Sequence, residues 1–349
     1  MSDLSISKRQ RLQQWLHHKT FNLLIKIVIV GLFLIAIYFQ VFARENAADL
    51  WATFRQQFNW HQLPYLLAVC LLVPINWGFE TYKFKTLMRP TAQLGFWQTY
   101  RAILAGITVS LFTPNRVGEV GGRILLVASA HNWQAATATI AGSISQLIVL
   151  LAMGFLGAIY FIFYVVQQPF DGVEWMLVGG ILLVVLLLSA FYHTHLLLPF
   201  ARRLPYYSWW KKRLGRQLGA LWAYESHQLS IALLFSLLRY LTYSFQYFLM
   251  LHFFGINVPL ATAVSGIATI FLLQTSIPLP PVVGLLARGE IALGIWGLFS
   301  PLSLHILAAS FSLFVINLSL PALIGAVFIA KINVLNSLGY DREDNKKEA

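Results

Sequence analysis

The sequence predicts an all-α, polytopic membrane bundle with about six full spans and two oppositely oriented re-entrant helical hairpins. Of its 349 residues, 58% are hydrophobic and only 11% are charged, well below the roughly one quarter charged in soluble domains. Three runs, 124–170, 240–287 and 291–330, contain no Asp, Glu, Lys or Arg. A helix needs about 20 apolar residues to cross the hydrocarbon core, so these runs predict membrane helices.

Six apolar segments, in chain order, predict the spans. They are Leu23–Phe42, Leu63–Tyr82, Trp133–Val166, Glu174–Leu198, Gln228–Phe254 and Ser303–Ala330. We expect a cytoplasmic N-terminal segment at 1–22, a single transmembrane domain at 23–330 and a cytoplasmic tail at 331–349. The polar, basic start lacks a small-residue cleavage site, so we expect no cleaved signal peptide.

The positions of the basic residues predict the orientation in the membrane. The loop 199–219 carries six basic residues and no acid, and the loop after the second span carries Lys83, Lys85 and Arg89. Basic loops stay on the cytoplasmic side. The connection 167–174 carries only acids and therefore faces outward. We expect a multi-pass protein of the inner (plasma) membrane with both termini in the cytoplasm.

Two segments interrupted by Pro and Gly predict the re-entrant hairpins. If the flanking spans are as assigned, the segment 96–131 begins and ends on the cytoplasmic side of the membrane. The segment 259–302 then begins and ends on the external side. The halves, about 63–166 and 228–330, then form an inverted repeat, which is common in transporters. Irregular backbone at membrane depth is tolerated where it lines a cavity or is buried in protein, so we expect a central cavity.

Charged and polar residues in and beside these breaks are the candidate substrate-binding residues. A charge at the bilayer centre costs about 2.5–3.5 kcal/mol and therefore pairs or faces water. The candidates are Glu80, Pro114, Arg116, Gly118, Glu119, Arg123, Gln146, Arg239, Gln246, Pro280, Gly284, Arg288 and Glu290. Arginine suits a lipid phosphate because its planar fork holds two oxygens, and helix N-termini after the breaks also favour anions.

A purely structural reading of the same charges stays open. Arg116 with Glu119, or Arg288 with Glu290, are expected in that reading to pair only to fix the hairpins. The three glycines at 118, 121 and 122 fit either a hinge or tight packing. The helix glycines Gly142, Gly154 and Gly157 indicate close packing between spans.

Other chemistry finds little support in the sequence. The single cysteine, Cys70, rules out a disulfide within one chain or a cysteine-based metal site. The nine histidines are scattered, and we find no nucleotide-binding loop or nucleophile elbow. We expect no catalytic residues, no metal and no cofactor. The net charge is +12, and the basic residues cluster near the ends of the predicted spans. At these positions they interact with anionic lipid headgroups, so we expect no nucleic-acid partner.

Three patterns carry a family resemblance. They are Asn76-Trp77-x-x-Glu80-x-x-Lys83, then Ser110-Leu111-x-Thr113-Pro114-x-Arg116-x-Gly118-Glu119, and Pro278-x-Pro280 with Gly284 and Glu290. Together they resemble the flippase-like membrane region of the lysylphosphatidylglycerol synthase family. The resemblance implies an eight-segment bundle with re-entrant helices and a lipid-headgroup cavity. Full-length synthases add a soluble aminoacyl-transferase domain; since this chain ends at Ala349, we expect no aminoacylation by it alone.

The main hypothesis is a lipid translocase that binds an anionic, aminoacylated or polyprenyl-phosphate lipid headgroup in the cavity. In it, Arg116, Arg123 and Arg288 hold the phosphate while Glu119 and Glu290 pair with them. The first alternative is a membrane enzyme or enzyme subunit that acts on a lipid-linked substrate through its carboxylates. The second is a scaffold for a separate soluble transferase docking on the basic loop. The sequence leaves the oligomeric state open.

Overall fold

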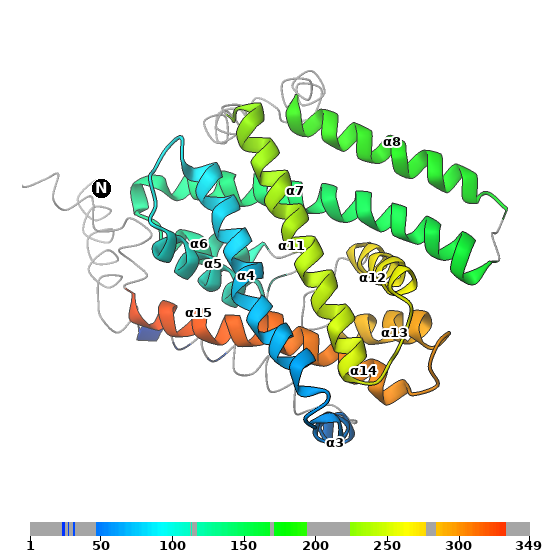
Figure 1. The fold of residues 1–349 in the computed structure, drawn as a ribbon. Helices are drawn as coiled ribbons and strands as arrows, with labels where there is room; N and C mark the ends of the chain where they lie inside the picture. Colours follow the sequence, from blue (N-terminus) through cyan, green and yellow to red (C-terminus); the bar gives the residue numbers. More distant parts are fainter. Residues whose placement is uncertain are drawn as a thin grey trace, which may run out of the picture.

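The computed structural model describes residues 47–111, 113, 117–167, 171–193, 224–276 and 284–332, with isolated positions in 23–31. All regular secondary structure in these residues is helical (Figure 1), which confirms the predicted all-α class, whereas the predicted number of spans stays a prediction. Most of the predicted first span, the basic loop 199–219 and both predicted cytoplasmic ends lie outside the described residues.

The long helices match the remaining predicted spans. They are α4 (Leu63–Met88), α7 (Asn132–Tyr160) with its π-helical extension η3 (Phe161–Val166), α8 (Val173–Tyr192), α11 (Ser226–Phe253), and α14 (Ser303–Phe314), which continues through π-helical η5 (Val315–Ser319) into α15 (Leu320–Lys331). In the described part of the chain, four of these helical stretches are long and apolar enough to cross a membrane, and α11 falls short because it is more polar. The chain is therefore a multi-pass membrane protein.

Shorter helices occupy the two segments that interrupt the spans. They are α5 (Phe96–Ser110), α6 (Gly118–Ile124), α12 (Leu260–Thr275) and α13 (Gly284–Trp296). A short amphipathic helix, α3 (Ala47–Gln57), precedes α4, and a 3-10 turn, η2 (Ser129–His131), precedes α7. Each short helix has fewer than the roughly 20 residues of a span. Insertion from opposite membrane faces and the inverted repeat stay predictions.

Helices α4 and α11 run side by side through the middle of the bundle (Figure 1). Helix α7 packs on both of them, and α8 folds back along α7 as an antiparallel partner. On the other side, α5 packs against α6 and α15. The apolar core around Phe84 and Ile103 forms where α4 and α5 meet, and a second core around Tyr247 and Trp296 joins α11 to α13. This arrangement brings α4, α6, α7 and α11 together.

Glycines set the close approach of α5, α6 and α15. A Cβ on Gly122 would lie 2.4 Å from the carbonyl oxygen of Ala105, and one on Gly325 would lie 2.1 Å from that of Leu104. Neither position has room for a side chain. Gly122 therefore serves tight packing, which draws α6 and its charged side chains against the bundle. Gly118, a predicted site residue, also packs this way, and its N–H donates to Oγ1 of Thr113 at 2.7 Å.

A proline shapes the break between α14 and α15. Pro321 has no N–H to donate to the carbonyl of Asn317, four residues earlier. That carbonyl instead accepts a hydrogen bond from the indole Nε1 of Trp77 on α4, at 3.1 Å. The π-helical η5 therefore supplies a backbone acceptor that holds a large side chain of α4 in place.

The structure corrects one assignment from the sequence. Helix α4 continues past the predicted end at Tyr82 to Met88, so Lys83 and Lys85 lie within the helix and not in a loop. Lys83 is buried. The orientation rule assumes that lysines lie in loops, whereas here the ammonium of Lys83 pairs at 2.8 Å with the carboxylate of Glu80, one turn earlier in the helix.

Candidate functional site

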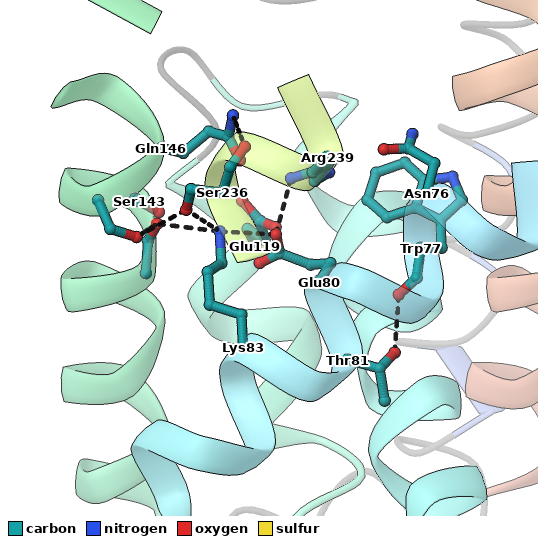
Figure 2. Close-up of polar contacts among 12 residues, drawn as sticks. Asn76, Trp77, Glu80, Thr81, Lys83, Glu119, Ser143, Gln146, Ser236 and Arg239 are labelled. Atoms are coloured by element: carbon teal, nitrogen blue, oxygen red, sulfur yellow. Dashed lines mark hydrogen bonds and ion pairs between the residues drawn. The ribbon is translucent and has the colours of Figure 1, made fainter. Parts of the chain in front are cut away.

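A single glutamate gathers three cations inside the bundle. The carboxylate of Glu80 on α4 lies 2.8 Å from Nζ of Lys83, 2.8 Å from Nη2 of Arg123 on α6, and 2.8 Å from Nη1 of Arg239 on α11. Figure 2 shows Glu80 directed toward Arg239, with Lys83 beside it. Glu80 therefore ties three helices that are far apart in the sequence.

A second carboxylate completes the group. Glu119 and Arg123 lie one turn apart on α6, and Oε1 of Glu119 accepts a hydrogen bond from Nη2 of Arg123. The i,i+4 spacing places both side chains on one face of the helix. The same Nη2 reaches Glu80, so Arg123 bridges the two carboxylates. We call Glu80, Lys83, Glu119, Arg123 and Arg239 the charge cluster.

The charge cluster is almost closed to its surroundings. The side chains of Lys83, Arg123 and Glu80 are 1–3% exposed, whereas those of Glu119 and Arg239 are 9% and 12% exposed. Among the described residues, three cations of the cluster face two carboxylates, which leaves a surplus of one positive charge in this part of the chain. Removing ions from water is expensive unless they are well paired, so this surplus marks the cluster as more than a set of balanced ion pairs.

Hydroxyl and carbonyl groups hold Lys83 on its other side. Its Nζ lies 3.4 Å from Oγ of Ser236 (Figure 2). It also donates to the carbonyl of Gly142 at 3.1 Å, and Oγ of Ser236 lies 2.9 Å from Oγ of Ser145. Gly142 and Ser145 belong to α7, and Ser236 belongs to α11. The lysine therefore links α4 to both neighbouring helices, and Gly142 leaves room for its chain.

Aromatic rings support two of the arginines. The guanidinium carbon of Arg239 lies 4.4 Å from the ring centroid of Trp77, and that of Arg123 lies 5.1 Å from the centroid of Phe84. Cations over aromatic faces gain on the order of 0.5–2 kcal/mol, most when desolvated. Because Asn317 fixes Trp77, the position of Arg239 is coupled to the break between α14 and α15.

Two of the buried polar atoms around the cluster keep unused hydrogen-bonding capacity. Within the described part of the chain, Nε of Arg123 has no acceptor and Oε1 of Gln146 has no donor. Gln146 borders the cluster through Ser236, whose carbonyl lies 3.4 Å from its Nε2. Buried polar groups are nearly always satisfied, so these two atoms are candidates to bind a polar ligand.

Four of the predicted site residues, Glu80, Glu119, Arg123 and Arg239, come together in the cluster, and Gln146 lies at its edge. Gln246 has a different role: its Nε2 donates to the carbonyl of Val69 at 2.9 Å and pins α11 to α4. Pro114, Arg116 and Pro280 lie outside the described residues, and so does the predicted Arg116–Glu119 pair.

The residues predicted in the second break lie on α13. Gly284 is buried at its first position, Arg288 is half-buried with its guanidinium carbon 5.6 Å from the ring centroid of Phe314, and Glu290 is exposed. Residues two apart on a helix do not face each other, so Arg288 and Glu290 point in different directions. Phe314 precedes Asn317 by one turn of the α14–η5 segment.

Sequence reasoning missed Lys83 and Ser236 as site residues. The spacing of Glu80 and Lys83 was the available signal for the lysine, because residues three apart on a helix are neighbours. Ser236 carries no signal of its own, since a lone serine in an apolar helix usually caps a backbone carbonyl or packs between helices.

Comparison with known proteins gave one match. The family described as the lysylphosphatidylglycerol synthase TM region matches residues 23–325. A search of curated proteins and a search of solved structures found no match. The matched range covers every residue of the charge cluster.

Proposed function

The chain belongs to the family of the lysylphosphatidylglycerol synthase TM region, and on that premise we propose that it is a lipid translocase whose charge cluster binds an anionic lipid headgroup. The observation that carries the proposal is the surplus positive charge of three cations and two carboxylates at 1–12% exposure. A phosphate would balance that surplus. Arg123 also retains a buried Nε donor, and arginine matches phosphate oxygens in geometry.

The ligand would enter beside Arg239, the most exposed cation of the cluster. Its guanidinium rests on Trp77, so the binding group is held in place before the ligand arrives. A headgroup phosphate that pairs with Arg239 would loosen the contact of Arg239 with Glu80, which joins α11 to α4. Ligand binding and separation of these two helices would then be coupled.

Transport requires the cluster to open toward each side in turn. The short helices α5 with α6, and α12 with α13, are the elements that would move, because each is too short to span the membrane and packs against its own partner. In this mechanism the hairpins insert from opposite faces and open alternately. The structure would then represent an occluded state, since the cluster is nearly closed.

The proposed substrates are anionic, aminoacylated or polyprenyl-phosphate lipids. All three classes carry a phosphate attached to an apolar anchor. The amine of an aminoacylated headgroup would have to compete with the cations of the cluster for Glu80 and Glu119. Both carboxylates are engaged by cations, which suits binding better than proton transfer. We therefore propose transport and not catalysis, in the plasma membrane with both termini cytoplasmic.

Lipid movement in proteoliposomes tests the proposal. Fluorescent phosphatidylglycerol is incorporated, and the fraction quenched by external dithionite is followed over time for the wild type and Arg239→Gln. Loss of one charge-assisted contact, worth about 1.5–3 kcal/mol, predicts an approximately 10- to 100-fold slower exchange. Arg239→Lys keeps the charge and should retain part of the activity, and Arg89→Gln, at an exposed cation outside the cluster, serves as the matched control.

Equal rates of lipid exchange by the wild type and Arg239→Gln would overturn the proposal, provided that a cooperative thermal transition shows each protein to be folded. Equal rates for fluorescent phosphatidylglycerol and phosphatidylcholine would also contradict it, because the surplus positive charge predicts a preference for the net negative lipid.

A further inference from the structure

A groove lies on the side of the bundle between α4, α5 and the η5–α15 segment, and no residue of the charge cluster lines it. Its volume is about 500 Å³, within the roughly 300–1,000 Å³ of small-molecule sites. Cys70 and Pro74 line it from α4, Trp97 and Arg101 from α5, and Phe328 from α15. Apart from Arg101 and Tyr100, the lining residues are apolar. Among the described residues, no segment closes this groove, so it opens on the outside of the bundle, where a membrane protein meets lipid.

The length of the groove fits one leaflet. Its wall on η5 and α15 runs from Ile316 to Phe328, which is about 18 Å at 1.5 Å per residue. Half of a hydrocarbon core about 30 Å thick is about 15 Å. An extended acyl chain of one leaflet therefore has an apolar wall of matching length along the groove.

The groove has a basic, aromatic end. Arg101 is exposed, its guanidinium carbon lies 5.6 Å from the ring centroid of Phe328, and no carboxylate of the described residues forms an ion pair with it. Trp97, one turn earlier and also exposed, is the kind of residue found at membrane interfaces. Arg101 is the sixth residue of α5, near the N-terminal end of that helix.

One face of α5 lines the groove, including its basic and aromatic end. Trp97, Tyr100, Arg101 and Leu104 have i, i+3, i+4 and i+7 spacing, which places them in one stripe along the helix, and all four line the groove. The stripe changes from interfacial and basic residues to buried Leu104 with increasing depth. The groove is therefore polar at the end with Arg101 and apolar along the rest of its length. A phospholipid has the same division, with a polar headgroup and an apolar acyl chain.

We propose that this groove is a binding site for an anionic phospholipid, with one acyl chain along α15 and the phosphate on Arg101. Free phosphate lacks the apolar part that the walls require, so the occupant is a lipid. The site shares no residue with the charge cluster, so it does not depend on the translocase proposal.

The test uses the full chain in lipid nanodiscs that contain phosphatidylglycerol with a photoactivatable diazirine in one acyl chain. After illumination, labelled peptides are identified by mass spectrometry. We expect labelling of the α15 residues from Leu320 to Phe328 to exceed that of α8, which is also exposed and apolar, by at least several-fold. Arg101→Gln should reduce groove labelling approximately 10-fold, and Arg89→Gln, at another exposed cation, should leave it unchanged.

Cys70, the single cysteine, is exposed and lines the groove, which gives a second readout. Its reaction with a membrane-permeant maleimide should be slow in phosphatidylglycerol nanodiscs and faster in the Arg101→Gln variant or in phosphatidylcholine. Millimolar inorganic phosphate should leave the rate unchanged.

Equal labelling of α15 in the wild type and Arg101→Gln, or labelling of α15 no stronger than that of α8, would overturn the proposal. Slow maleimide reaction in every lipid and both variants would also overturn it. The two sites are separable: Arg101→Gln should keep the preference of the translocation assay for phosphatidylglycerol, and Arg239→Gln should keep groove labelling.

Discussion

Replacing Glu80 by glutamine should destabilise the protein strongly, because Glu80 holds three cations together. Each contact is 2.8 Å long, and unit charges about 4 Å apart at an effective dielectric constant of about 20 attract by about 4 kcal/mol. The gross attraction is therefore on the order of 12 kcal/mol. The variant no longer has to desolvate a carboxylate, which returns several kcal/mol, and broken buried pairs typically lose about 3–5 kcal/mol.

The measurement is the apparent melting temperature in detergent, followed by intrinsic tryptophan fluorescence. A loss of about 3–5 kcal/mol predicts a decrease on the order of 10 °C for Glu80→Gln. The double variant Glu80→Gln with Lys83→Met removes one charge of each sign and should recover part of the loss. Glu290→Gln is the matched control, because Glu290 is exposed, and it should stay within about 0.5 kcal/mol of the wild type.

Two results would refute this reasoning. A melting temperature for Glu80→Gln equal to that of Glu290→Gln would mean that the cluster contributes nothing to stability. Strict additivity of Glu80→Gln and Lys83→Met would mean that the two side chains do not interact, because residues in contact show coupling energies of about 0.5–3 kcal/mol.

Two further stability predictions rest on neighbouring contacts. Gly122→Ala should lower stability by about 1–3 kcal/mol because its Cβ would meet the carbonyl of Ala105 at 2.4 Å, whereas Gly121→Ala, with open space around it, should be neutral or slightly stabilising; equal melting temperatures would contradict the close α5–α6 packing. Trp77→Phe keeps a ring beneath Arg239 but removes the donor to the Asn317 carbonyl, and should lower stability by about 1 kcal/mol in the same melting assay. A larger loss on Gly121→Ala than on Gly122→Ala, or an unchanged Trp77→Phe, would count against these contacts.

The helices could be predicted from the sequence because membrane spans follow from length and polarity alone. The predicted spans beginning at Leu63 and Ser303 match α4 and the α14–η5–α15 segment. Their ends were less certain: the prediction ended the second span at Tyr82 because lysines follow it, whereas α4 continues because Lys83 finds a carboxylate at the previous turn. Where such a helix ends depends on ion pairs between its side chains, and a hydropathy profile contains no information about these pairs.

The candidate site could be predicted only in part. Glu80, Arg123 and Arg239 were recognisable because charges are rare in apolar runs, but their meeting at one point depends on how α4, α6 and α11 pack. The expected pairing of Glu119 with Arg116 lies beyond the described residues, whereas its contact with Arg123 follows the i,i+4 spacing of a helix. Long-range contacts between helices leave no periodic trace in a single sequence.

Equilibrium binding of a short-chain anionic phospholipid to the purified protein tests the central claim most directly. Dissociation constants of phosphatidylglycerol and phosphatidylcholine with equal chains are measured for the wild type, Arg101→Gln, Arg239→Gln and the double variant. If the charge cluster holds a phosphate, phosphatidylglycerol binds the wild type more tightly, and Arg239→Gln weakens it about 10-fold or more even when Arg101 is already replaced. An unchanged affinity on replacing Arg239 in the Arg101→Gln background would contradict the account and leave the cluster with a structural role only.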